Sequence, residues 1–167
     1  SEIRVEGGPG VGSRFIFEAV FGVSTAGLDV DFIPATDLRG LKTLAVDDNE
    51  SARRVITEYL NSFTFEVSQA VDGPSALSAI EEAEKQGKPF ELVLMDYMMP
   101  GMDGIEATSR IKKELSLKKR PVVIMATAYG HEEVIRRSEK VVDGFLVKPI
   151  YQSTLFETIM EAFGRTG

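Results

Sequence analysis

Leu92-Val93-Leu94-Met95-Asp96, near the middle of the chain, is a short apolar run that ends in a carboxylate. The pattern recurs three times: apolar runs at 44–46, 122–126 and 145–147 are followed at once by Asp47 and Asp48, Thr127 and Lys148. If the runs are parallel strands, these five polar side chains meet at one edge of a sheet. In open α/β sheets that edge is where ligands bind.

The alternation of patterns from residue 41 onward predicts five strand–helix units. Strands are expected at 41–46, 65–70, 90–95, 122–126 and 144–147. Residues with helical spacing follow each strand. In the first helix they are Ala52, Val55, Ile56, Tyr59 and Phe63. A second helix is expected to start at Asp72-Gly73-Pro74, and a fourth at about 131–141. Nearly continuous apolar strands favour a parallel sheet covered on both faces, which is an α/β fold.

Composition excludes several classes of function. The chain of 167 residues is 43% hydrophobic and carries a net charge of −7. An acidic chain is a poor ligand for nucleic acid or an anionic membrane. With no cysteine, a disulfide or thiolate metal site is impossible, which is compatible with a cytoplasmic location. No apolar stretch approaches the length of a membrane span. The start, Ser1-Glu2-Ile3, is neither a signal peptide nor a natural start, so we expect a piece of a longer protein.

The first forty residues follow a different pattern, with a glycine-rich segment at 7–14. A phosphate-binding loop needs a lysine and then a helix, but here Ser13 is followed by Arg14 and by residues that alternate with strand period. We therefore predict a β-hairpin with strands at 3–5 and 14–20. Residues 24–40 lack periodicity and are expected to form a linker.

The three aspartates predict a cation site. Two carboxylates about 4 Å apart repel by roughly 4 kcal/mol at an effective dielectric constant near 20, so a group of three takes up protons or binds a cation. Oxygen ligands with no His or Cys nearby suit Mg²⁺. A carboxylate can also attack phosphorus, and Lys148 and Thr127 could then contact the oxygens of the transferred group.

The motifs together resemble the receiver domain of two-component response regulators. They are Val46-Asp47-Asp48-Asn49, Asp96 to Gly104, Thr127-Ala128 and Lys148-Pro149. The resemblance covers residues 41–164 and implies a flavodoxin-like, doubly wound, five-stranded sheet of order 2-1-3-4-5. It also implies a cis Lys148–Pro149 bond, because receivers characteristically have one there.

The same resemblance implies a role for each site residue. Asp96 would accept a phosphoryl group from a phosphohistidine. Asp48, Asp96 and the Met98 carbonyl would hold Mg²⁺, with Asp47 acting mainly through water. Thr127 and Lys148 would contact the phosphoryl oxygens. Phe145, three residues before the lysine, would be the aromatic switch that acts with Thr127. Such a domain is a self-catalysing phosphoacceptor rather than a turnover enzyme.

The N-terminal segment Gly12-Ser13-Arg14-Phe15-Ile16-Phe17 resembles the last hairpin of a histidine kinase ATP-binding domain. The resemblance implies a hybrid sensor histidine kinase, with a kinase remnant at 1–22, a linker at 23–40 and a receiver at 41–167. The partner would be the kinase dimerisation and phosphotransfer domain or a separate histidine phosphotransfer protein. No nucleic acid and no direct membrane contact are expected for this chain, although the parent kinase could carry a membrane anchor.

Two other functions fit some of the same residues. A Mg²⁺-dependent phosphatase with an aspartyl nucleophile typically needs a second aspartate two positions later as a general acid and base, and Met98 stands there. A pseudo-receiver would be an interaction module that works without phosphorylation. The full acidic pair, Asp47 and Asp48, together with Asp96, Thr127 and Lys148, argues against it.

Overall fold

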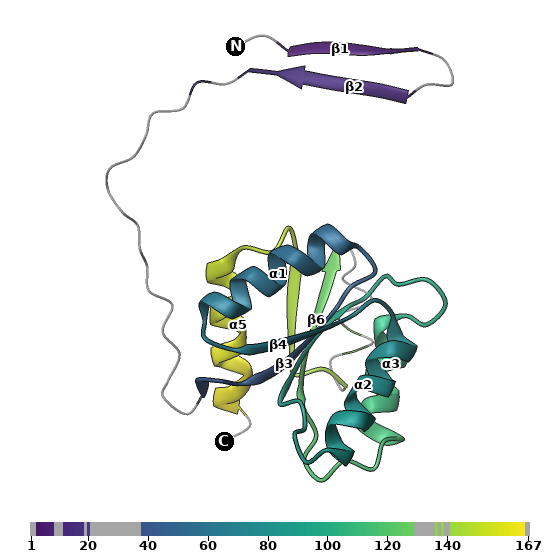
Figure 1. Ribbon diagram of the computed structural model, residues 1–167, viewed down its shortest axis with the longest axis vertical. Helices are drawn as coiled ribbons and strands as arrows, with labels where there is room; N and C mark the ends of the chain where they lie inside the picture. Colours follow the sequence, from purple (N-terminus) through teal and green to yellow (C-terminus); the bar gives the residue numbers. More distant parts are fainter. Residues whose placement is uncertain are drawn as a thin grey trace. The chain divides into compact units, whose positions relative to one another are not determined.

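The apolar runs form the strands of one parallel sheet (Figure 1). The structure is a computed structural model that describes residues 3–8, 12–18, 20, 38–128, 136, 138 and 141–165. The strands are β3 (Lys42–Val46), β4 (Glu66–Ala70), β5 (Leu92–Asp96), β6 (Val122–Ala128) and β7 (Gly144–Lys148). Their order across the sheet is β4-β3-β5-β6-β7, which confirms the predicted flavodoxin-like order.

Three of the strands extend beyond the end of the apolar run that predicted them. β5 includes Asp96, β6 continues to Ala128, and β7 includes Lys148. Ala128 pairs with Lys148, because backbone hydrogen bonds do not depend on the polarity of the side chain. Asp96, Thr127 and Lys148 are therefore held inside the sheet, and only Asp47 and Asp48 follow the end of their strand. At the opposite edge β3, β4 and β5 begin one or two residues later than predicted.

Helices cover both faces of the sheet (Figure 1). α1 (Glu50–Ser62) and α5 (Gln152–Arg165) lie on one face, and α2 (Gly73–Lys85) and α3 (Gly104–Lys113) lie on the other. The helix predicted at 131–141 falls largely outside the described residues. Within that range Arg136 and Ser138 are described, and both are helical. None of the helices in the described part of the chain is long and apolar enough to cross a membrane.

Two hydrophobic clusters show that the sheet is doubly wound. Successive side chains of a strand point to opposite faces. Leu44 and Val93 accordingly belong to the cluster under α2 and α3, whereas Ala45 and Leu94 belong to the cluster under α1 and α5. Strands buried on both faces need apolar residues at nearly every position, and this is the pattern that the sequence shows.

The buried face of α1 agrees only in part with the predicted one: Ile56 and the C-cap residue Phe63 are buried as predicted, and Tyr59 packs against the core. The buried residues of this helix are Arg53, Ile56 and Leu60, whereas Val55 is 39% exposed. The stripe has the spacing i, i+3, i+7 expected of a helix on a sheet, but a guanidinium occupies its first position. Hydrophobicity alone could not identify that position.

The N-terminal hairpin is also confirmed. β1 (Ile3–Gly8) pairs antiparallel with β2 (Gly12–Phe17), and a strand rather than a helix follows the glycine-rich segment. The hairpin belongs to a unit at residues 1–31 that is separate from the unit at 32–167. Residues 9–11 and most of the predicted linker, 21–37, lie outside the described residues. The domain boundaries at 22 and 40 stay a prediction.

Gly104, the first residue of α3, lies in direct contact with the end of β5. A Cβ atom at this position would overlap the backbone carbonyl oxygen of Asp96. The Gly104 N–H donates to the Tyr97 carbonyl at 2.9 Å, and the Asp103 carboxylate caps the helix by accepting from the Glu106 N–H at 2.8 Å. The absence of a side chain thus lets α3 start beside Asp96.

We predict that Gly104→Ala destabilises the fold by about 1–3 kcal/mol, because an overpacked methyl group must displace backbone rather than a flexible side chain. Urea denaturation measures the change. Gly164→Ala in α5 is the matched control, since a Cβ atom there meets nothing within 4 Å. That variant should be neutral or more stable, because alanine favours a helix over glycine. Equal effects of the two changes would contradict the steric explanation.

Candidate functional site

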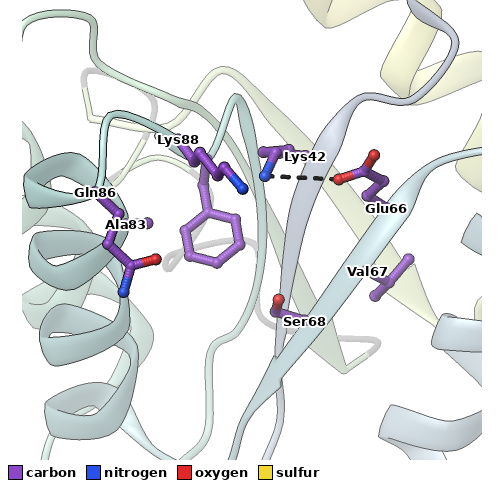
Figure 2. Close-up of a pocket in the computed structure, with 8 residues that line it drawn as sticks. Lys42, Glu66, Val67, Ser68, Ala83, Gln86 and Lys88 are labelled. Atoms are coloured by element: carbon purple, nitrogen blue, oxygen red, sulfur yellow. Dashed lines mark ion pairs between the residues drawn. The ribbon is translucent and has the colours of Figure 1, made fainter.

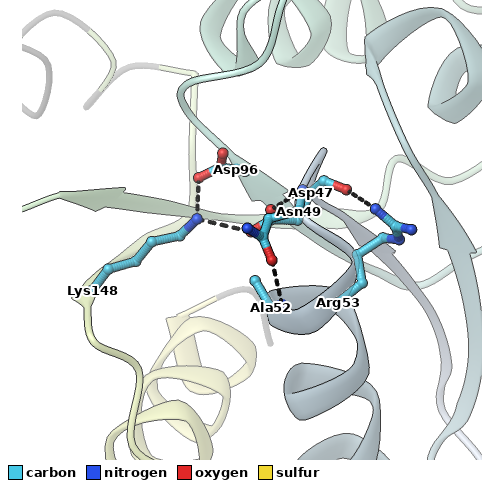
Figure 3. Close-up of polar contacts among 6 residues, drawn as sticks. All are labelled: Asp47, Asn49, Ala52, Arg53, Asp96 and Lys148. Atoms are coloured by element: carbon cyan, nitrogen blue, oxygen red, sulfur yellow. Dashed lines mark hydrogen bonds and ion pairs between the residues drawn. The ribbon is translucent and has the colours of Figure 1, made fainter. Parts of the chain in front are cut away.

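One ammonium group joins two buried carboxylates at the carboxyl edge of the sheet. Lys148 Nζ lies 2.8 Å from Asp47 Oδ2 and 2.8 Å from Asp96 Oδ1 (Figure 3). Asp47 is 1% exposed and Asp96 is 5% exposed. The loop after β3 and the last residues of β5 and β7 supply the three side chains, as the strand-end pattern predicts.

Asp47 is held at three of its oxygens. Its Oδ2 accepts from Lys148, and its Oδ1 accepts from the Asn49 N–H at 2.9 Å. Its backbone carbonyl accepts from Arg53 Nη1 at 2.6 Å (Figure 3). Asn49 also caps α1 by accepting from the Ala52 N–H at 3.0 Å. The loop between β3 and α1 is therefore fixed by hydrogen bonds on both sides of Asp48.

Asp48 completes a group that fits a divalent cation. One carboxylate oxygen from each of Asp47, Asp48 and Asp96 lies within 4.8 Å of the others, and Asp48 is exposed to solvent. Three carboxylates and one ammonium leave a formal charge of −3 + 1 = −2 in this cluster. Hard oxygen donors with an open, solvated side are the ligands that Mg²⁺ prefers. The residues present therefore fit the predicted ion.

The electrostatics of the cluster raise two pKa values. Burial is the main cause that raises the pKa of Asp96 above its ordinary value of 3.8. Lys148 opposes this shift, and the negative charges of Asp47 and Asp48 add to it. Burial lowers the pKa of Lys148, but its hydrogen bonds and charge interactions with Asp47 and Asp96 raise it above 10.5 overall. Lys148 is thus a permanent cation.

The other predicted site residues lie around this cluster. Thr127 is buried on β6, which pairs with both β5 and β7. Met98 is 65% exposed and, with Asp48, lines a depression of about 420 Å³. Phe145, on β7, is half-buried and packs against a small cluster that contains Met125. The Met98 carbonyl as a ligand and the switch role of Thr127 and Phe145 stay predictions.

The Lys148–Pro149 peptide bond is cis, which confirms that prediction. Sequence reasoning missed Arg53, which reaches Asp47 from inside the helix. The available signal was its spacing, since Arg53 stands three residues before Ile56 and seven before Leu60 on one helix face.

A second depression lies at the opposite, amino-terminal edge of the strands. It measures about 310 Å³ and is lined by residues that include Lys42, Glu66, Lys88 and Phe90 (Figure 2). Lys42 and Glu66 form an ion pair at 3.6 Å, and exposed pairs of this kind contribute about 0–1 kcal/mol. Its lining lacks the grouped carboxylates of the other edge, so the candidate site is the Asp47–Asp96–Lys148 cluster.

Comparison with known protein families matches residues 43–160 to the response regulator receiver domain. The chain belongs to this family. The receiver is 32% identical over 128 residues to the chemotaxis protein CheY-3 of Vibrio cholerae, covering 76% of this chain and 95% of that protein. The predicted resemblance to receivers is therefore confirmed, and the hairpin lies outside the matched residues.

Solved structures agree with the family match. The receiver domain of the histidine kinase CKI1 from Arabidopsis thaliana, complexed with Mg²⁺ and BeF₃⁻, is 36% identical with a TM-score of 0.65. The match covers 77% of this chain and 93% of that chain. Vibrio cholerae CheY4 is 32% identical with a TM-score of 0.61, and the match covers 72% of this chain and 97% of that chain.

We predict that Asp96→Asn stabilises the receiver at pH 7 in the presence of EDTA. A raised pKa means that the folded state binds the proton more tightly than the unfolded state. The associated stability is present below pH 3.8 and is lost as the pH rises through the raised pKa of Asp96. Asparagine does not ionise, so the variant does not lose this stability. The stability advantage of Asp96→Asn over the wild type should therefore shrink as the pH falls.

Denaturation curves of both proteins across the acidic range measure this difference. Carboxylates distant from the site titrate alike in both proteins and cancel in the comparison. A difference that does not depend on pH, or that grows on acidification, would contradict the electrostatic account.

Proposed function

We propose that this receiver is the phosphoacceptor of a two-component phosphorelay and that Asp96 takes a phosphoryl group from a phosphohistidine. The observation that carries the proposal is the buried pair of Asp47 and Asp96 on one lysine, with Asp48 at cation-binding distance. Lys148 offsets the charge of the Asp96 carboxylate, and a carboxylate can act as a nucleophile.

In the proposed step an Oδ atom of Asp96 attacks phosphorus. The donor's other ring nitrogen carries a proton, so when the bond between phosphorus and the imidazole nitrogen breaks and its electrons return to that nitrogen, the histidine leaves as a neutral imidazole. Lys148 then exchanges its contact with Asp96 for a phosphoryl oxygen, and the Thr127 hydroxyl donates to another. Asp48, Asp96 and the Met98 carbonyl would hold Mg²⁺, with Asp47 acting through water; the bound ion would neutralise charge on the phosphoryl oxygens.

Acetyl phosphate tests this step without a partner protein. With Mg²⁺, mass spectrometry should find one phosphoryl adduct on the wild type, and EDTA or Asp96→Asn should abolish it. Asp103→Asn is the matched control, because Asp103 lines the same depression and asparagine is an equally good helix cap. This variant should be labelled normally.

The same experiment separates the alternative functions. A wild type that takes up no phosphate from acetyl phosphate would favour a pseudo-receiver. Sustained hydrolysis of small phosphoesters would favour a phosphatase with an aspartyl nucleophile. Labelling of the Asp96→Asn variant would exclude the proposed acceptor.

An apolar groove beside the site supports a protein donor. It measures about 330 Å³ and is lined by Ser51, Ala52, Val55 and Ile56 of α1 and by Lys148, Pro149 and Ile150. Lys148 belongs to both the groove and the phosphoacceptor site. A donor that brings a phosphohistidine to the almost fully buried Asp96 must cover the adjoining surface. We propose that an apolar helical face of the histidine kinase or phosphotransfer partner occupies this groove.

Val55→Glu should slow phosphoryl transfer from the protein donor by about tenfold, because a buried carboxylate in the docked complex costs more than 1 kcal/mol. Labelling by acetyl phosphate should stay unchanged. Val71→Glu is the control, since Val71 is 50% exposed and does not line the groove. Equal slowing by both variants, or slowing with acetyl phosphate, would contradict donor docking at α1.

The N-terminal hairpin supports the hybrid-kinase context. Ile3 pairs with Phe17 and Val5 with Phe15, so four large apolar side chains share one face, each 60–73% exposed. An isolated two-stranded hairpin is marginally stable at best in water, and such a face is normally covered by further structure. We propose that residues 1–22 end a kinase ATP-binding domain, that 23–40 link it to the receiver, and that the whole acts in the cytoplasm.

Phosphorylation would act on the rest of the receiver through Thr127 and Phe145. Thr127 lies on β6 between the strands that carry Asp96 and Lys148, and Phe145 is half-buried on β7. When the Thr127 hydroxyl moves to a phosphoryl oxygen, the space beside it changes and Phe145 would turn inward. The proposed output is therefore a changed surface around β7.

A further inference from the structure

Arg53 is a buried cation next to the phosphoacceptor site with no role in the phosphoryl transfer described above. It is 9% exposed and occupies a position of α1 that faces the sheet, in line with Ile56 and Leu60. Placing a guanidinium among apolar side chains is unfavourable unless its donors are used. Arg53 Nε is buried and has no hydrogen-bond partner among the residues that the structure describes.

The contact that Arg53 makes is with the backbone between the two aspartates. Its Nη1 donates to the carbonyl oxygen of Asp47 at 2.6 Å (Figure 3). That oxygen belongs to the peptide unit that joins Asp47 to Asp48. Because a peptide unit is planar, a fixed carbonyl also fixes the N–H and Cα of Asp48. The next restraint along the chain is the Asn49 N–H, which donates to Asp47 Oδ1 at 2.9 Å.

Asp48 needs this restraint more than the other two aspartates do. Asp47 and Asp96 are each held directly by Lys148, whereas Asp48 is exposed and forms no ion pair with any residue that the structure describes. Its direction therefore depends on the backbone that carries it. If the Asp47–Asp48 peptide turned, the Asp48 oxygen would leave the group of three that lies within 4.8 Å.

We propose that Arg53 is a positioning residue: by holding the Asp47 carbonyl it aims Asp48 at Asp96 and so raises the affinity of the site for a divalent cation. This inference rests on the proposed function, since it assigns a role toward the same cation. A positioning role and a purely electrostatic role of Arg53 predict opposite changes in cation affinity when the side chain is removed. Removal of a nearby positive charge alone would strengthen cation binding, whereas loss of the restraint weakens it.

Titration calorimetry with MgCl₂ tests the proposal on the whole chain. Arg53→Met keeps the length of the side chain and removes its donors, and it should raise the Kd for Mg²⁺ about tenfold, as loss of a group that orients a ligand typically does. Arg53→Lys can still donate to the carbonyl and should stay within about twofold of the wild type. Arg54→Met is the matched control, because Arg54 is the exposed neighbour with the same charge.

A second measurement separates positioning from general damage to the fold. The Mg²⁺ concentration that gives half-maximal labelling by acetyl phosphate should rise with the Kd, while the labelling rate at saturating Mg²⁺ stays within about twofold. Thermal unfolding should change little, because a partly satisfied buried charge contributes little to stability. If Arg53→Met fails to fold, Arg53→Gln replaces it, since that side chain is too short to reach the carbonyl.

The outcomes are distinct for the two proposals. A folded Arg53→Met or Arg53→Gln variant that binds Mg²⁺ as tightly as the wild type, or more tightly, overturns the role of Arg53 and leaves the phosphoacceptor function intact. An equal loss in Arg54→Met overturns it as well. A wild type that binds no Mg²⁺ overturns the proposed function itself.

Discussion

The receiver depends on the compensation of buried negative charge by Lys148. Asp47 and Asp96 are almost completely removed from solvent, and each lies 2.8 Å from the same Nζ atom. At an effective dielectric constant near 20, two carboxylates about 4 Å apart repel by roughly 4 kcal/mol, which is comparable with the whole stability of a small domain. The cation makes it possible to keep a reactive carboxylate ionised inside the protein and still fold.

Strand order brings the charged groups together. β3 and β5 are neighbours in the sheet, but the chain leaves the end of β3 for α1 on one face and the end of β5 for α3 on the other. A crevice forms at such a point in doubly wound sheets. Asp47 and Asp48 lie on one side of it and Asp96 on the other, and β7, two strands farther along, supplies Lys148. The hydrophobic clusters on the two faces hold these strand ends in register.

Much of this arrangement could be predicted from the sequence, because apolar runs mark strands buried on both faces. The strand order, the hairpin and the grouping of Asp47, Asp96 and Lys148 followed from that pattern together with the family motifs. The predicted strand ends were less accurate, because backbone pairing continues through Thr127 to Ala128, past the end of the apolar run at 122–126. The inward position of Arg53 was missed, because a search for apolar residues passes over a guanidinium; only its spacing from Ile56 and Leu60 indicated it.

The distance along the chain between the charged partners has a consequence for biosynthesis. Asp47 and Lys148 are 101 positions apart. A ribosome that adds 5–20 residues per second makes Asp47 about 5 to 20 seconds before the lysine. During that time the first strands cannot close around the carboxylates without burying uncompensated charge. The amino-terminal half of the receiver should therefore remain open on the ribosome, and the sheet should close only when β7 emerges.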